Sequence, residues 1–172
     1  MKEEYPPQIP ELNTLANEDE YFMREALKEA WKAFFAEEVP IGAVIVKNGQ
    51  IIARGHNQVE MLQDATAHAE LLSITAAESA VCNWRLLETK LYSTIEPCAM
   101  CAGAILLARI PELIWGAQDL RHGANGSWVN LFRMQHPTHT VKITSSVLEE
   151  WCQIPLKLFF QKRRKENKES WL

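Results

Sequence analysis

Residues 90–116, KLYSTIEPCAMCAGAILLARIPELIWG, decide the fold that we predict for this sequence. They indicate a strand over residues 90–94, a helix over residues 98–107 and a second strand over residues 112–116. Strands that alternate with helices form a parallel or mixed sheet covered by helices, and binding sites gather at the carboxyl ends of its strands. Because the cysteines of this stretch directly follow a strand, they are placed where a site is expected.

The segments on either side continue the alternation. Residues 17–38, NEDEYFMREALKEAWKAFFAEE, offer an N-cap at Asn17, acids in the first turn and one apolar helical face. Residues 42–55, GAVIVKNGQIIARG, form two β-rich runs around Asn48-Gly49, which predicts a hairpin. Three further elements are predicted: a helix over 67–79, a strand over 140–144 and a helix over 147–165. Pro155 lies in the last of these, where it is expected to kink or interrupt the helix. The predicted class is α/β.

Length and composition narrow the class of protein. A chain of 172 residues fits one domain, and we expect residues 1–17 to be a flexible extension of a single domain over residues 18–172. No run of about eighteen uncharged apolar residues is present, so no membrane span is predicted. The first residues, MKEEYPPQIPELN, are acidic and rich in proline, unlike a secretory signal, and a cytoplasmic location is therefore expected.

Charge is distributed unevenly along the chain. The net charge is −4, but residues 1–38 hold ten acidic and four basic residues, so the remainder carries +2. Positive charge gathers towards the C-terminus, in Lys157, Lys162, Arg163, Arg164, Lys165 and Lys168 against Glu166 and Glu169. A basic run of this kind is either a solvated helix end or a local site for a polyanion, and both interpretations stay open.

Cys98 and Cys101 stand in the first turn of the helix predicted over residues 98–107, where the helix dipole favours thiolates. Three residues apart on a helix, they project from nearly the same face and can bind one ion together. Without secretory features, the four cysteines of the chain indicate metal or redox chemistry rather than disulfides. The pair alone is compatible with a metal site and with a redox dithiol.

Residues 64–79, DATAHAELLSITAAES, add His68 and Glu70 to this pair. A neutral imidazole is a common zinc ligand, and two cysteines with one histidine form a known catalytic set that leaves a fourth position for water. Glu70 lies about 200° around an ideal helix from His68, so it is poorly placed as a ligand but suited to proton transfer. Taken singly, His68 is equally explained as a core or cap histidine and Glu70 as a first-turn acid.

His68-Ala69-Glu70 followed by Pro97-Cys98-Ala99-Met100-Cys101 is the signature of zinc nucleobase deaminases. The segments VPIGAVIV, GHN, DATAHAE, NWRLLETKLYSTIEPCAMCAGAI, ARI, WGAQDLRHGANGS and FFQKRR resemble the tRNA-specific adenosine deaminases of bacterial type. The resemblance runs from about residue 18 to residue 166 and so covers nearly the whole chain.

This resemblance implies a cytidine deaminase-like fold, a three-layer α/β/α sandwich with a mixed central sheet. It also implies a homodimer, one zinc ion per chain, and conversion of the wobble adenosine of a tRNA anticodon to inosine. The implied site comprises the zinc ligands His68, Cys98 and Cys101, the proton shuttle Glu70, the base-pocket residues Val39 and Asn57, the anticodon-loop contacts Asp119 and Arg121, and the C-terminal contacts Phe160, Arg163 and Arg164.

Several of these residues have structural explanations that the sequence leaves open. Asn57 is a common turn residue after a strand, Asp119 and Arg121 fit an ordinary loop pair, and Phe160 fits a core. Trp128 and Pro155 depart from what the resemblance leads us to expect.

Three other functions remain as alternatives. One is deamination of a free nucleobase such as guanine or cytosine by the same zinc chemistry. The second is an RNA-binding scaffold with a structural zinc, which would have no use for Glu70. The third is a thiol redox protein, which would have no use for His68.

Overall fold

A mixed sheet forms the centre of the structure, a computed structural model that describes residues 7–169, with side chains up to residue 166. The strands are β1 (Gly42–Lys47), β2 (Gln50–His56), β3 (Thr89–Ile95), β4 (Glu112–Ala117) and β5 (Lys142–Thr144), and their order in the sheet is β2-β1-β3-β4-β5. β1 pairs antiparallel with β2 and β3, whereas β3–β4 and β4–β5 are parallel. The mixed sheet predicted above is therefore confirmed.

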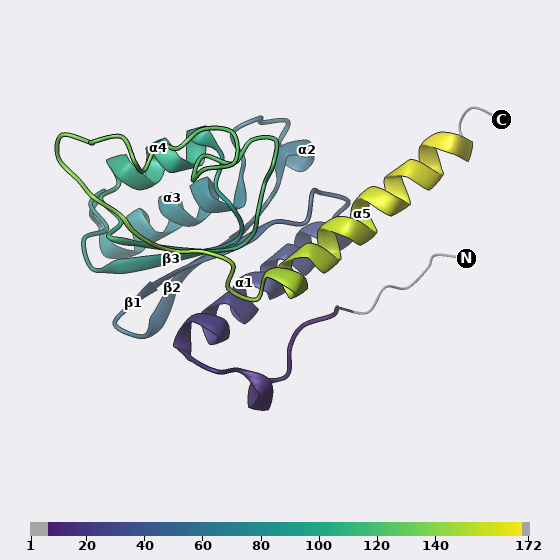
Figure 1. Cartoon of the computed structure of the whole chain (residues 1–172), viewed down its shortest axis with the longest axis horizontal. Coiled ribbons are helices and arrows are strands. Elements are labelled where there is room, and N and C mark those ends of the chain that lie inside the picture. The colour runs from purple at the N-terminus through teal and green to yellow at the C-terminus, as the bar shows by residue number, and fades with distance from the viewer. Residues whose placement is uncertain (1–6, 170–172) are drawn as a thin grey trace.

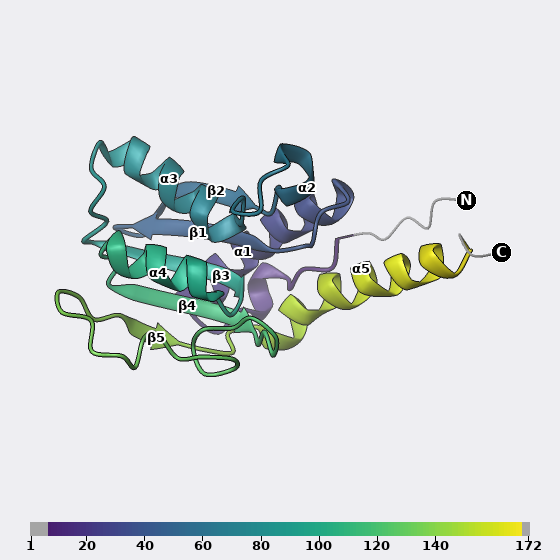
Figure 2. The ribbon, with the colours of Figure 1, turned by 90° about the horizontal axis from the view of Figure 1, so that it is seen from above.

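The helices form a layer on each face of the sheet. They are α1 (Glu18–Phe35), α2 (Val59–Leu62), α3 (Ala69–Val81), α4 (Ala99–Leu107) and α5 (Glu149–Glu169), preceded by a short 3-10 helix over Leu12–Thr14. Figures 1 and 2 show α3 and α4 on one face, and α1 and α5 on the other. This arrangement confirms the three-layer α/β/α sandwich.

The strands separate two apolar cores by simple alternation. On β1, Ile45 packs towards α3 and α4, while its neighbours Val44 and Val46 pack towards α1 and α5. Leu91 and Tyr92 divide in the same way on β3. Successive side chains on a strand point to opposite faces, so an unbroken apolar strand such as β1 requires a helix layer on both sides.

The first helix and the hairpin form as their sequences predict. The side chain of Asn17 accepts a hydrogen bond from the backbone N–H of Glu20 at 3.0 Å, as an N-cap does. The whole predicted apolar face of α1 is buried: Phe22, Ala26, Leu27, Ala30, Trp31 and Phe34. Asn48 and Gly49 both have positive φ, at 51° and 71°, which suits the tight turn between β1 and β2.

Residues 8–10 lie against α1. The indole N–H of Trp31 donates to the carbonyl of Gln8 at 3.0 Å, and Nε of Arg24 donates to the carbonyl of Pro10 at 2.7 Å. Ile9 packs against the core between the sheet and the helices α1 and α5, and against a smaller cluster formed by Trp31, Phe34 and Phe159. The flexibility expected for residues 1–17 stays a prediction, and its first six residues lie outside the described part of the chain.

α5 runs alongside α1 and extends well beyond the edge of the sheet (Figures 1 and 2). It is continuous through Pro155, so the interruption expected there is wrong, and the kink that was the other possibility stays a prediction. Pro155 is buried, and packing against the rest of the protein compensates for the missing backbone hydrogen bond. No helix among residues 7–169 is long and apolar enough to cross a membrane.

Close packing brings the first turn of α3 over the sheet. A Cβ at Gly55 in β2 would overlap the carbonyl oxygen of Ala69 and the side chain of Ser73, so only glycine lets α3 approach this closely. The first turn of α4 follows β3 directly, and β3 pairs with β1. The N-termini of α3 and α4 consequently meet above the same edge of the sheet.

Candidate active site

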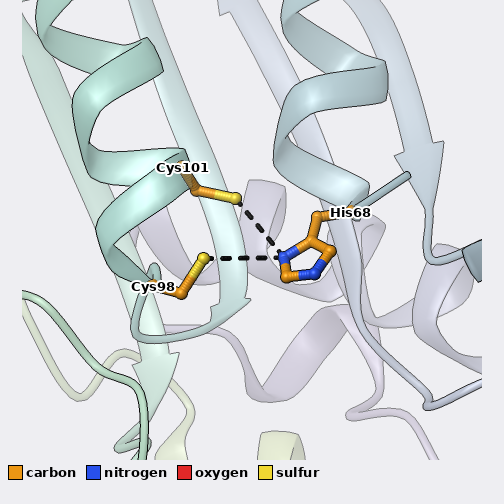
Figure 3. A group of neighbouring side chains, drawn as sticks. All are labelled: His68, Cys98 and Cys101. Atoms are coloured by element: carbon orange, nitrogen blue, oxygen red, sulfur yellow. Dashed lines mark hydrogen bonds between the residues drawn. The ribbon is translucent and has the colours of Figure 1, made fainter. Parts of the chain in front are cut away.

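His68 and Cys98 are the N-cap residues of α3 and α4, and Cys101 lies in the first turn of α4. The Nδ1 atom of His68 is 3.6 Å from the Sγ atom of Cys98 and 3.6 Å from that of Cys101 (Figure 3). All three ligand atoms lie within 4.8 Å of one another. The structure thus brings together the three predicted ligands, whose positions in the sequence are about thirty residues apart.

This triangle has the size that a zinc ion requires. Zinc–sulfur bonds of about 2.3 Å and zinc–nitrogen bonds of about 2.0 Å at tetrahedral angles place nitrogen and sulfur about 3.5 Å apart. The observed distances of 3.6 Å match that separation. Two cysteines and one histidine supply three of the four ligands of a tetrahedral site, which fits one Zn²⁺ per chain with one position left for water.

The pKa values of the two thiols are shifted in opposite directions. A hydrogen bond from the Cys101 thiol is the main cause that lowers the pKa of Cys98 to about 4, and His68 lowers it further. The same hydrogen bond, together with burial, raises the pKa of Cys101. The pKa of His68 is raised, chiefly by its hydrogen bond with Cys98. The protein alone therefore favours one thiolate, and a metal ion supplies the charge that stabilises a second.

Glu70 is the second residue of α3 and is 2% exposed. Its Oε1 atom accepts a hydrogen bond from the hydroxyl of Ser93 on β3 at 3.2 Å. Burial is the main cause that raises its pKa, although the charge of His68 opposes this. Glu70 is outside the triangle of ligand atoms but lines the same cavity as His68 and Cys98, as a proton-transferring residue should.

A cavity of about 1050 Å³ opens above the triangle. Except for the buried Cys101, every site residue named from the sequence lines it: Val39, Asn57, His68, Glu70, Cys98, Asp119, Arg121, Phe160, Arg163 and Arg164. Binding cavities for small molecules usually measure about 300–1,000 Å³, so this one lies at the upper limit of that range. Its outer wall carries the arginines of α5.

Two buried glutamates that the sequence analysis missed form the walls of the cavity. Glu38, 1% exposed, accepts hydrogen bonds from the backbone N–H groups of Glu60 at 3.2 Å and Met61 at 2.7 Å. It also accepts one from the side-chain amide of Asn57 at 3.4 Å. Glu38 thereby fixes the wall made by Asn57 and α2.

Glu96 holds the opposite wall. Its carboxylate, on a residue that is 1% exposed, accepts backbone hydrogen bonds from Asp119 at 3.3 Å, Asn125 at 2.8 Å and Ser127 at 3.2 Å, and a further one from the Ser127 hydroxyl. A Cβ at Gly123 would overlap this carboxylate, so the loop closes tightly around it. The only signals in the sequence were a glutamate before Pro97-Cys98 and a second in front of Val39-Pro40.

The remaining site residues divide between turn and surface. The Oδ1 atom of Asp119 accepts from the backbone N–H groups of Arg121 at 3.0 Å and His122 at 3.1 Å, so this side chain stabilises its own turn. On α5, Phe159 is buried, whereas Phe160 is 48% exposed and faces the cavity. Of the basic residues near the C-terminus, the structure describes the side chains up to Lys165. The side chain of Lys168 lies outside the described residues.

Comparison with known protein families agrees with this site. Residues 16–117 match the cytidine and deoxycytidylate deaminase zinc-binding region. The tRNA-specific adenosine deaminase of Bacillus subtilis is 48% identical over 88% of this chain and 94% of its own length. The chloroplastic tRNA(adenine(34)) deaminase of Arabidopsis thaliana is 49% identical over 84% of this chain, but the match spans 12% of that longer protein.

Solved structures place the fold in the same group. One from a study of A-to-I editing by tRNA:A34 deaminases superposes with a TM-score of 0.76 at 44% identity and covers 79% of this chain and 99% of its own. A guanine deaminase from Bacillus subtilis superposes with a TM-score of 0.55 at 40% identity, over 58% of this chain and 64% of its own. Both the family match and the extent of the identity lead to the same conclusion. The chain belongs to the zinc-binding cytidine and deoxycytidylate deaminase family and, within it, to the tRNA-specific adenosine deaminases.

Proposed function

We propose that this protein converts the wobble adenosine of a tRNA anticodon to inosine by zinc-dependent hydrolytic deamination. The observation that carries the proposal is the position of the buried Glu70 beside the His68, Cys98 and Cys101 triangle, in a cavity that Arg121, Arg163 and Arg164 also line. Relatives that share 45–49% identity over most of the chain and are named as tRNA deaminases support the RNA substrate.

In this proposal His68, Cys98 and Cys101 hold the metal. When bound, zinc lowers the pKa of a water molecule towards neutrality and stabilises negative charge as it develops. The three side chains hold their Nδ1 and Sγ atoms at the spacing such an ion needs, and they reach it from two helix N-termini fixed to one sheet. That rigid attachment keeps the site in place when RNA binds.

Glu70 moves the protons. Its carboxylate takes a proton from the attacking water and delivers that proton to N1 of adenine while oxygen adds to C6. It then transfers the second proton of the water to the amino group, which leaves as ammonia, so adenosine and water give inosine and ammonia. Burial and the hydrogen bond from Ser93 hold the carboxyl in one position between these steps.

The substrate residues act around this centre. Val39 and Asn57 would surround the extruded base, and Asp119 and Arg121 would line the path of the anticodon loop. Phe160, Arg163 and Arg164 would contact the RNA from α5. An anticodon loop suits such a site because its wobble base is already unpaired, and extruding it costs only stacking.

The proposal also covers the extent of the domain, the location of the protein and its assembly. Residues 18–172 act as one deaminase domain, and the protein works in the cytoplasm as a homodimer in which the neighbouring subunit completes the RNA groove. Sedimentation of the active enzyme tests the assembly. A fully active particle of 19.7 kDa, the mass of one chain, would exclude the dimer.

A side-by-side assay tests the substrate. An anticodon stem-loop with adenosine at the wobble position should yield inosine, whereas free adenosine, adenine, guanine and cytosine should remain nearly unchanged. The solved guanine deaminase with a similar fold makes guanine the important competitor. Faster turnover of free guanine than of the stem-loop would replace the RNA substrate and leave the deaminase chemistry intact.

A further inference from the structure

Apolar packing fixes α5 beside the cavity. Phe159 is 5% exposed and clusters with Trp31 and Phe34 of α1, with 6.4 Å between the ring centroids of Phe34 and Phe159. Burial of an aromatic side chain contributes far more to stability than an exposed ion pair does. The position of α5 therefore does not depend on the charged contacts that lie further along it.

α1 ends in a turn that places a glutamate where glycine is usual. The backbone N–H of Glu37 donates to the carbonyl of Phe34 at 3.2 Å, and that of Glu38 donates to the carbonyl of Ala33 at 2.9 Å. This is a Schellman motif with Glu37, at φ 64°, in the left-handed position. A residue with a side chain is less favourable than glycine in this conformation, which Gln63 and Cys82 also adopt at the ends of α2 and α3.

Glu37 contacts two of the basic residues of α5. Its carboxylate pairs with the ammonium of Lys162 and lies 3.5 Å from Nη2 of Arg163, while its carbonyl accepts a hydrogen bond from the same Nη2 at 3.0 Å. Glu166 approaches Lys162 at 3.9 Å and Arg163 at 3.3 Å from the other side. Two acids thus neutralise two cations of α5, one of which, Arg163, lines the cavity.

Arg164 differs from its neighbour. It lines the cavity and is exposed, and it makes no ion pair with any side chain among residues 7–166. Arg163 also lies over the ring of Phe159, 5.2 Å from its centroid. A phosphate can therefore approach Arg164 directly, whereas at Lys162 and Arg163 it must displace a carboxylate.

We propose that Glu37 sets how strongly α5 holds RNA phosphates, by competing with them for Lys162 and Arg163. The inference rests on the proposed function, because it requires an RNA substrate. Deamination changes one base and leaves every phosphate in place, so phosphate contacts bind substrate and product equally. A built-in competitor weakens both and speeds release of the inosine product without affecting the chemical step.

The test replaces Glu37 by Gln, with Glu88→Gln as the matched control. Glu88 is also an exposed acid in an ion pair, with Lys47 at 3.2 Å. This pair lies where β1 ends and β3 begins, at the end of these strands that is opposite to the cavity. Binding of an inosine-containing anticodon stem-loop, which is not turned over, is measured from about 50 to 200 mM KCl. Glu37→Gln should tighten binding by about three- to tenfold at low salt and steepen the salt slope by about 1. Glu88→Gln should change neither.

Kinetics give the second readout. The half-saturating enzyme concentration for the adenosine stem-loop should fall by the same factor, and the single-turnover rate at saturation should stay unchanged. Glu37→Gly, which suits the left-handed backbone and also removes the charge, should reproduce the gain if Gln disturbs the turn. Unchanged or weaker binding in both variants, or a tenfold loss of single-turnover rate in both, would overturn the inference.

A double-mutant cycle assigns the gain to its partner. Arg163→Ala should cost little RNA affinity in the natural protein and more in the Glu37→Gln background, whereas Arg164→Ala should cost the same in both. Equal costs for Arg163→Ala in both backgrounds would contradict competition at this residue. Because the natural enzyme is assayed for inosine formation in parallel, failure to deaminate the stem-loop would count against the proposed function and not against this comparison.

Discussion

The side-chain amide of Asn57 donates a hydrogen bond to the buried carboxylate of Glu38, with 3.4 Å between Nδ2 and Oε2. An ionised carboxylate only accepts, so the nitrogen of the amide must face Glu38. The oxygen of Asn57 is then left to accept a hydrogen bond from a bound base. In the proposed function Glu38 would thus be a positioning residue, which acts on the substrate through Asn57.

Glu38→Gln should impair recognition more than chemistry. Because the new amide has to face backbone N–H groups of α2 that now meet only one acceptor, Asn57 loses its fixed orientation. We expect kcat/KM for the stem-loop to fall by about 10- to 100-fold, mostly through KM. Steady-state kinetics check this, with thermal melting as the control for folding. A kcat/KM within twofold of the natural enzyme would show that Asn57 does not need Glu38.

Glu70→Gln should separate catalysis from binding. The amide cannot accept the proton of the attacking water, so deamination should fall by about three or more orders of magnitude while zinc content and RNA affinity persist. Glu78→Gln, on the same helix but away from the cavity, is the matched control and should retain activity. Residual activity within tenfold of the natural enzyme would assign proton transfer to another group.

Cys98→Ala should remove the metal. With one of three ligands lost, zinc measured by elemental analysis should fall from about one per chain to nearly none, and the melting temperature should fall because metal binding is linked to folding. Cys82→Ala removes an exposed thiol far from the triangle and should keep both. A natural protein without zinc, in which Cys98 and Cys101 form a reversible disulfide, would instead support the redox interpretation.

Periodicity was sufficient to predict most of the fold, because the relevant interactions are local or repeat along one element. The apolar face of α1, the Asn48-Gly49 turn and the alternation of strands and helices each have a short-range pattern. Pro155 shows the limit of this reasoning. The lost backbone hydrogen bond is a local effect, but Pro155 is buried in a continuous helix, and tertiary packing of that kind is not reported by any local pattern.

The candidate site divides in the same way. His68, Cys98 and Cys101 could be predicted because metal ligands require particular residue types at particular helical spacings. Glu38 and Glu96 could not, since their partners are hydrogen-bonding groups 19 to 31 residues away that any loop sequence provides. Nor did the sequence show that Arg163 meets Glu37 while Arg164 stays exposed, because adjacent arginines are indistinguishable until α5 is placed against α1.

Acid should destabilise the protein through the carboxylates of α1 that face β2. Burial raises the pKa of Glu29, but hydrogen bonds from His56 and Lys32 and the charges of Lys32 and Arg54 outweigh it, so the pKa lies below its ordinary value of 4.5. A carboxyl whose pKa is lowered on folding stabilises the protein above pH 4.5, and that contribution is lost as the pH falls through the lower, folded value. Glu29→Gln should therefore reduce the free energy of unfolding by about 1–3 kcal/mol near neutral pH and by much less near pH 3.

Urea denaturation across this range of pH checks the prediction for Glu29→Gln, and Glu88→Gln is the control. The zinc ligands are the same in the natural protein and in both variants, so protonation of these ligands affects all three stabilities alike. The difference in the free energy of unfolding between Glu29→Gln and the other two proteins therefore reports on Glu29. A difference that stayed constant from neutral pH to pH 3 would show that Glu29 stabilises the fold by packing and not by its charge.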